Sequence, residues 1–124
     1  MDTVSENTSL IAASKVNGTY VYNRAGENLG TIYDVMIDKV SGKVQYAIMS
    51  FGGFLGMGDS YHPLPWNQLK YDVDKGGYRV NLDKRQLENA PSFTSTASPN
   101  WDDRSYGNRI NDYYGNTGGW GSQL

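Results

Sequence analysis

Apolar and polar positions between residues 28 and 51 alternate as they do in two long neighbouring β-strands. In the first strand, residues 28–38, the odd positions form the expected apolar face, and these are Tyr33, Val35 and Ile37. The Ser41-Gly42 pair suits a hairpin loop, because glycine adopts the left-handed backbone conformation without strain. We therefore expect residues 28–38 and 44–51 to pair as an antiparallel hairpin.

The second strand, residues 44–51, differs from the first because both of its faces are apolar. One face carries Val44, Tyr46 and Ile48, and the other carries Ala47, Met49 and Phe51. A strand that is apolar on both faces is stable only when both faces are covered. The pattern thus predicts that a segment outside the sheet shields one of them.

Shorter runs predict the remaining strands. We expect strands at residues 19–22 and 59–64, a single helical turn at 65–69, and a last hairpin formed by residues 70–73 and 78–82. Gly30 lies near the start of the longest strand and predicts a bulge or corner at which the sheet bends. These strands and the glycine-rich turns between them favour an all-β fold, a small and strongly bent β-barrel.

A short helix is expected directly after the last strand. Asp83 suits the N-cap position, and Gln86 stands three residues later, as in a capping box. Leu82 and Leu87 have the spacing of a hydrophobic staple. Pro91 ends this helix.

The C-terminal region carries an aromatic pattern at helical spacing. Its members are Trp101, Tyr106, Ile110, Tyr113 and Tyr114. We expect a short amphipathic helix over residues 102–114 that is weak alone, since Gly107 and three asparagines lower its helix propensity. The organisation predicted is a flexible arm at 1–13, the barrel at 14–91, and a linker with an aromatic docking tail at 92–124.

Exposed tryptophan and tyrosine clusters are usual at interfaces, so the tail raises two alternatives. The helix packs either on its own barrel or on the barrel of a neighbouring subunit, which would give an intertwined homodimer. The candidate interaction residues are Phe54, Leu55, Met57, Trp101, Tyr106, Ile110, Tyr113, Tyr114 and Trp120.

Composition narrows the function classes. The 124-residue chain has a formal net charge of -2, so it offers no electrostatic footprint for nucleic acid or for an anionic bilayer. Cysteine is absent, which excludes disulfides and thiolate chemistry. No apolar run is long enough to span a bilayer, and the N-terminus lacks the pattern of a signal peptide, so we expect a cytoplasmic protein, either free or peripheral at the inner membrane face.

No catalytic, cofactor-binding or metal-binding set is predicted. The glycine-rich loop at residues 52–58 lacks the lysine of a phosphate loop and presents apolar side chains, so it is either a barrel corner or a contact loop. His62 is the single histidine, and Asp59 and His62 would point to opposite faces of a strand, so a metal site is not expected. A Ser-His-Asp triad has no supporting pattern around His62.

The order and spacing of several motifs resemble the PRC-barrel family. The motifs are Gly26-Glu27-Asn28-Leu29-Gly30-Thr31-Ile32, the strand ending at Asp38, Ser41-Gly42-Lys43-Val44, Gly52-Gly53-Phe54-Leu55-Gly56 and Pro63-Leu64-Pro65-Trp66. The family includes the cytoplasmic domain of the photosynthetic reaction-centre H subunit and a ribosome-maturation factor. The resemblance implies a six-stranded antiparallel barrel that serves as an interaction module without catalytic residues.

Three functions follow from this resemblance as expectations. The first is a non-enzymatic, self-associating interaction module that binds a protein or the cytoplasmic side of a membrane complex. The second is an accessory role in photosynthetic electron transport. The third is RNA or ribosome binding, which the acidic chain disfavours.

Overall fold

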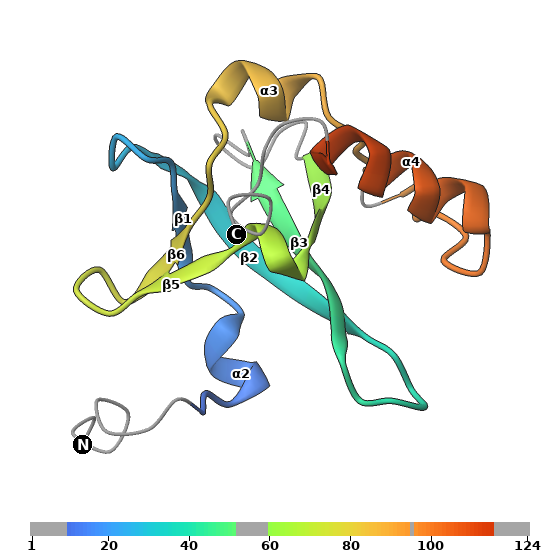
Figure 1. Ribbon diagram of the computed structural model, residues 1–124, viewed down its shortest axis with the longest axis horizontal. Coiled ribbons are helices and arrows are strands. Elements are labelled where there is room, and N and C mark those ends of the chain that lie inside the picture. The colour runs from blue at the N-terminus through green and yellow to red at the C-terminus, as the bar shows by residue number, and fades with distance from the viewer. Residues whose placement is uncertain (1–9, 52–59, 95, 116–124) are drawn as a thin grey trace.

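The computed structural model describes residues 10–51, 60–94 and 96–115. It is mostly sheet with short helices (Figure 1). The elements are α2 (Ala13–Val16), β1 (Tyr20–Tyr22), β2 (Asn28–Ile37), β3 (Val44–Phe51), β4 (Ser60–Pro65), η2 (Trp66–Gln68), β5 (Lys70–Asp72), β6 (Gly77–Arg79), α3 (Lys84–Glu88) and α4 (Arg104–Gly115).

The six strands form one mixed sheet in the order β4-β3-β2-β1-β6-β5. The expectation of a fully antiparallel, closed barrel is corrected on two points. First, β1 and β6 pair in parallel. Second, no strand pairing joins the two ends of the sheet, β4 and β5, within the described residues. Pro63 and Pro65 of β4 lack the N–H that a ladder needs, and β5 has only three residues.

The predicted apolar face of β2 is wrong at two of its three positions. Tyr33 is 56% exposed and Ile37 is 49% exposed, whereas Leu29 and Ile32 are buried. Two irregularities in the pairing with β3 accompany these exposed positions. Ile32 pairs with Met49 and Asp34 pairs with Ile48, so Tyr33 is the extra residue of a bulge, and a second register shift falls between Met36 and Ile37.

Gly30 was expected at a bulge or corner, and it stands next to a register shift, since Val21 pairs with Gly30 and Tyr22 pairs with Asn28. It also lies at a close contact between strands. Its φ is +155°, and a Cβ at this position would lie 2.0 Å from the carbonyl oxygen of Ser50. The sheet therefore requires glycine where β2 pairs with the end of β3.

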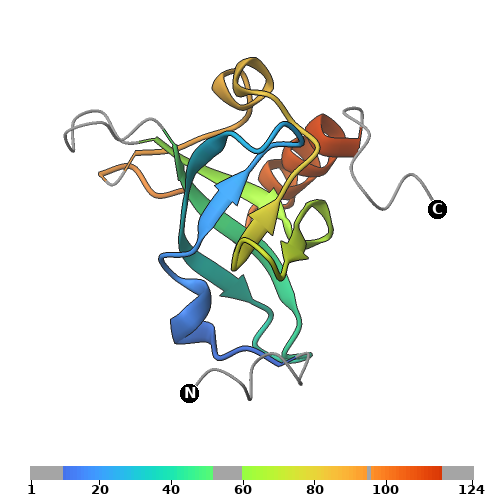
Figure 2. The same cartoon turned by 90° about the vertical axis from the view of Figure 1, so that its left-hand side faces the viewer.

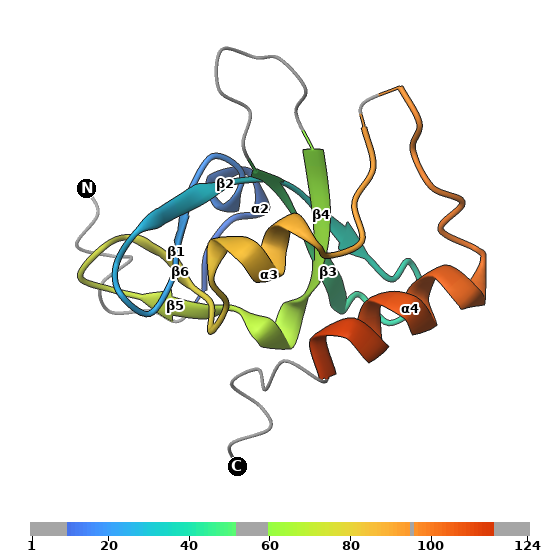
Figure 3. The same ribbon diagram turned by 90° about the horizontal axis from the view of Figure 1, so that it is seen from above.

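Both faces of β3 are covered, as predicted. Three consecutive residues, Ala47, Ile48 and Met49, are at most 2% exposed. Ala47 and Met49 belong to the main core with Leu64 of β4. Outside the sheet, α4 lies alongside β4 (Figure 3).

Helix α2 was not among the predicted elements. Its last residue, Val16, is 4% exposed and joins the main core. The Thr19 hydroxyl donates a hydrogen bond of 2.7 Å to the Val16 carbonyl, and Gly18 N–H donates to the Ile32 carbonyl at 2.7 Å. Tertiary packing therefore stabilises a helix of four residues that would not form alone.

Helix α3 has the predicted capping box. The Asp83 carboxylate accepts a hydrogen bond from Gln86 N–H at 2.8 Å, and the Gln86 side chain accepts one from Asp83 N–H at 2.9 Å. Leu82 and Leu87, the predicted staple pair, are both buried in the core.

Candidate interaction surface

Helix α4 packs on the sheet through one narrow face. Tyr106, Ile110 and Tyr114 follow each other at intervals of four residues, which places them on one side of the helix. Ile110 and Tyr114 are fully buried, and Tyr106 is partly buried against the core cluster. Burial also raises the pKa of the Tyr106 and Tyr114 hydroxyls, so both stay neutral at physiological pH.

The C-terminal turn of α4 is fixed to α3. The Tyr113 hydroxyl donates a hydrogen bond to the backbone carbonyl of Gln86. Gly107, one turn into α4, faces the Tyr46 hydroxyl of β3, which lies 3.1 Å from the position a Cβ would take. The small residue therefore allows the helix to approach the sheet closely at this point.

A continuous line of aromatic rings crosses the outer side of the sheet and reaches α4. We call it the aromatic row, and it consists of Tyr33, Tyr61, Phe93, Trp101, Tyr46 and Tyr106. Successive ring centroids are 4.6 Å apart for Tyr33 and Tyr61 and 5.6 Å apart for Tyr61 and Phe93. The Phe93 and Trp101 rings meet edge to face at 5.9 Å. These separations are typical of stabilising aromatic pairs.

The Trp101 ring is the branch point of the row, because it contacts one ring on β3 and another on α4. Its centroid lies 5.9 Å from that of Tyr46 on β3 and 5.7 Å from that of Tyr106 on α4. The Arg109 guanidinium stands 5.2 Å from the Tyr106 ring centroid, a cation–π distance. Trp101 thus joins the linker before α4 to both the sheet and the helix.

The row is unevenly exposed. Tyr61 is 8% exposed, Phe93 and Trp101 are partly exposed, and Tyr33 is 56% exposed at the far end. Large rings held rigidly by their neighbours lose little conformational freedom when they bind a partner. The exposed end of the row is therefore a preorganised aromatic surface.

The predicted interaction residues fall into three groups. Phe54, Leu55, Met57 and Trp120 lie outside the described residues. Trp101 and Tyr106 lie in the aromatic row and are partly accessible. Ile110 and Tyr114 are buried against the chain's own sheet, and Tyr113 is partly buried beside α3, so a partner could reach the buried pair only if α4 moved.

Sequence reasoning missed four members of the row: Tyr33, Tyr46, Tyr61 and Phe93. Phe93 had the clearest available signal, because it is the single aromatic residue in the otherwise polar stretch between Pro91 and Trp101. An isolated ring in a polar linker is typical of an anchor point.

The described residues contain no group of three or more metal-ligating side chains. His62 is 1% exposed, and its Nε2 lies 3.0 Å from the Ser60 hydroxyl. Burial lowers the pKa of His62 to about 4, and a backbone contact with Pro91 opposes that shift only in part. Within the part of the chain that is described, no carboxylate is bonded to this histidine, so the pair is a buried polar contact of the core.

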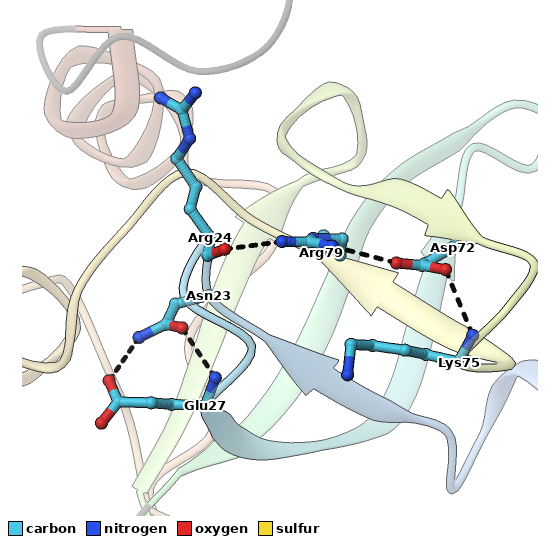
Figure 4. Close-up of polar contacts among 6 residues, drawn as sticks. All are labelled: Asn23, Arg24, Glu27, Asp72, Lys75 and Arg79. Atoms are coloured by element: carbon cyan, nitrogen blue, oxygen red, sulfur yellow. Dashed lines mark hydrogen bonds and ion pairs between the residues drawn. The ribbon is translucent and has the colours of Figure 1, made fainter.

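A second group of polar residues ties two turns together (Figure 4). The Arg79 guanidinium forms an ion pair with Asp72 at 3.2 Å and donates to the Arg24 carbonyl at 2.6 Å. Asn23 and Glu27 exchange two hydrogen bonds across the β1–β2 turn. The Asp72 carboxylate also accepts from Lys75 N–H at 3.1 Å, and this bond is the main cause of its lowered pKa.

A shallow depression of about 280 Å³ lies near this polar group. Its lining residues are Asn23, Arg24, Ala25, Asn81, Leu82, Asp83 and Gln86. The Arg24 guanidinium donates to the Asn81 side chain at 3.3 Å, and Asp83 and Gln86 are occupied in the capping box. The polar lining therefore supports the fold around the β1–β2 turn and α3.

Comparison with known proteins fits this architecture. The model of the PRC-barrel domain matches residues 9–87, more than half of the chain. The chain therefore belongs to the PRC-barrel family, as its motifs indicated. The linker after α3, Trp101 and α4 lie outside the matched range.

A search of curated proteins gave no match. Among solved structures, one similar chain is the 16S ribosomal RNA processing protein RimM from Pseudomonas aeruginosa, with 17% sequence identity and a TM-score of 0.40. The match covers 64% of this chain and 48% of that one, so the present chain spans about half the length of that protein. A similarity at this level carries no argument about partners or function. In the described residues, no helix has the length and apolar character required to cross a membrane.

Proposed function

We propose that this chain is a non-catalytic protein-interaction module that uses the aromatic row as its binding surface and associates with a second copy of itself. The observation that carries the proposal is the exposed end of the row, where the ring of the 56% exposed Tyr33 is tilted against that of Tyr61, with 4.6 Å between the ring centroids. An exposed tyrosine fixed by a buried neighbour is prepared for binding before a partner arrives.

Two further features support this function. First, the linker and α4 are additions to the family domain, and they extend the surface by supplying Phe93, Trp101 and Tyr106. Second, α4 is seated on its own sheet in the structure, so self-association through the row leaves the helix in place. A self-complementary contact of this kind gives a two-fold symmetric dimer.

The test is light scattering of the full chain across a range of concentrations. We expect a concentration-dependent dimer that the Tyr33→Ser variant weakens at least tenfold, as for a residue at the centre of an interface. Tyr20→Ser is the matched control, because Tyr20 is 51% exposed on β1 and lies outside the row. A monomer at all concentrations, or equal loss in both variants, would contradict self-association through this surface.

A further inference from the structure

Two segments that are far apart in sequence project from the same end of the molecule. One is the hairpin between β2 and β3, and the other is the lead-in to α2, residues 10–12. Both lie at the lower end of the view in Figure 1 and remain there when the molecule is turned about the vertical axis in Figure 2. We call this end the basal surface, formed by Leu10, Ile11, Lys15, Ile37, Lys39, Val40 and Lys43.

The basal surface exposes aliphatic side chains at its two most prominent points. Val40, in the hairpin loop, is 97% exposed, and Leu10, before α2, is 80% exposed. Ile37 and Ile11 stand beside them at 49% and 43%. Val40, Ile37 and Ile11 lie outside the core cluster, so their side chains can contact a partner without any rearrangement of the core.

The same surface is locally basic although the chain as a whole is acidic. Lys39 and Lys43 flank Val40, and Lys15 lies on α2, all three exposed. The one acidic group in the loop is Asp38, whose carboxylate accepts hydrogen bonds from Val40 N–H at 2.9 Å and Ser41 N–H at 2.8 Å. That carboxylate stabilises the loop, and its single negative charge is outnumbered by the charges of Lys39 and Lys43. Net positive charge is therefore concentrated where the aliphatic tips are.

The shape of the surface favours a planar and deformable partner. Its tips are two separate projections, and the depression of about 280 Å³ lies elsewhere, around the β1–β2 turn and α3. A rigid protein partner would need two pockets at matching positions, one for the β2–β3 hairpin loop and one for residues 10–12. The headgroup region of a bilayer, by contrast, deforms around each projection. Aliphatic side chains bordered by lysines are also the composition that binds anionic lipid surfaces.

We propose that the basal surface docks on an anionic lipid bilayer, with Val40 entering the headgroup region and Lys39 and Lys43 contacting lipid phosphates. The net charge of -2 is unfavourable for random contact with such a membrane, so only this end approaches it. This proposal is independent of the aromatic row, which belongs to a different surface.

The experiment is co-sedimentation of the full chain with vesicles of phosphatidylcholine and phosphatidylserine in equal parts, and with vesicles of phosphatidylcholine alone. We expect binding to the anionic vesicles only, weakened by added salt. Each lysine contributes about fivefold to the partition coefficient, so Lys39→Glu with Lys43→Glu should lower it by more than about twentyfold. Val40→Asp should lower it about tenfold, because a valine loses its apolar contact.

Val73→Asp is the matched control. Val73 is 72% exposed near the β5–β6 hairpin, but it stands between Asp72 and Asp74. This variant should bind the anionic vesicles like the unmodified chain. Equal binding to both vesicle types, retained binding in the Lys39/Lys43 and Val40 variants, or capture by soluble polyglutamate but by neither vesicle would overturn the proposal. The last outcome would indicate an acidic protein as the partner instead.

Discussion

Tyr61 of β4 and Phe93 of the linker exchange two backbone hydrogen bonds of 2.9 Å, one in each direction. Their rings also contact each other in a tilted arrangement, with centroids 5.6 Å apart. This bridge fixes the first part of the linker to the edge of the sheet. It thereby places Trp101 over Tyr46 and directs α4 along β4.

Replacing Phe93 should separate the ring contribution from the backbone contribution. We expect Phe93→Ala to lower the free energy of unfolding by about 1–2 kcal/mol, since a half-buried ring with two aromatic neighbours is lost. Phe93→Pro removes the bridging N–H as well and should cost about 1 kcal/mol more. Urea unfolding measures both values, and the exposed Thr94→Ala is the control with a change under about 0.5 kcal/mol. Equal effects of Ala and Pro would show that the bridge contributes nothing.

Ile110 anchors α4, so its truncation should weaken the whole fold. Ile110→Ala is expected to cost about 2–4 kcal/mol, because the side chain is fully buried in the main core. Asn111→Ala, on the exposed side of the same helix, should instead stabilise by about 0.5 kcal/mol through higher helix propensity. Thermal unfolding monitored by circular dichroism shows whether each variant lowers or raises the stability of the fold. If Ile110→Ala has no effect, α4 does not pack on the sheet in solution.

Two tyrosines of α4 should respond in opposite ways to the loss of their hydroxyls. Tyr113→Phe removes the hydrogen bond to the Gln86 carbonyl and should cost about 1 kcal/mol. The Tyr106 hydroxyl is buried and has no hydrogen-bond partner among the described residues. Tyr106→Phe should therefore be neutral or stabilising by up to about 1 kcal/mol. Chemical denaturation of the two single variants decides the point, and a larger loss for Tyr106→Phe would contradict the arrangement.

Two glycines with positive φ test the contact between β2 and β3. A Cβ at Gly42, with φ +78°, meets nothing within 4 Å, so Gly42→Ala should cost only the backbone strain of about 1 kcal/mol. At Gly30 the added carbon would meet the Ser50 carbonyl oxygen, so Gly30→Ala should cost about 3 kcal/mol or more. The measurement is the urea midpoint of each variant. Similar midpoints for both variants would show that the backbones of β2 and β3 do not approach each other this closely at Gly30.

The buried histidine should make the fold sensitive to mild acid. The pKa of His62 is lowered from 6.5 to about 4 in the folded chain, so between these values the unfolded chain binds the proton and the folded chain does not. Stability should thus fall as pH drops from about 6.5 to about 4, by a few kcal/mol at most, and level off below. The pKa values of Asp38, Asp72 and Asp103 are lowered in the folded chain. Protonation of these carboxylates therefore destabilises the fold only at a lower pH than the protonation of His62 does.

The His62→Gln variant supplies the control for this pH dependence. Glutamine does not titrate, so unfolding free energies at pH 6.5 and pH 4.5 should differ much less in the variant than in the unmodified chain. A variant that keeps the full difference would mean that another group is responsible.

Local features of the sequence predicted many elements well. The strand expected at 44–51 coincides with β3, and the capping box at Asp83 and Gln86 places the start of α3. The helix expected at 102–114 corresponds to α4 at Arg104–Gly115. These signals depend on residues within about one turn or one hairpin of each other, and that is the range over which local patterns act.

Features that depend on distant partners were missed or misplaced. The bulge at Tyr33 changes which face of the sheet the neighbouring β2 side chains occupy, and it is defined only by the pairing register with β3. Helix α2 depends on the burial of Val16 in the core. The structural role of Phe93 depends on its backbone pairing with Tyr61, which lies 32 positions earlier in the chain.

By itself, the sequence determined the approximate positions of the six strands and of helices α3 and α4, that both faces of β3 need cover, and which family the motifs resemble. Those properties follow from alternation, caps and turn residues that act locally. Only the tertiary structure decided that β1 and β6 run parallel, that β4 and β5 do not pair with each other within the described residues, and that rings from five separate segments meet in one row. Strand direction and ring contacts depend on how the intervening chain returns, and alternation carries no information about that path.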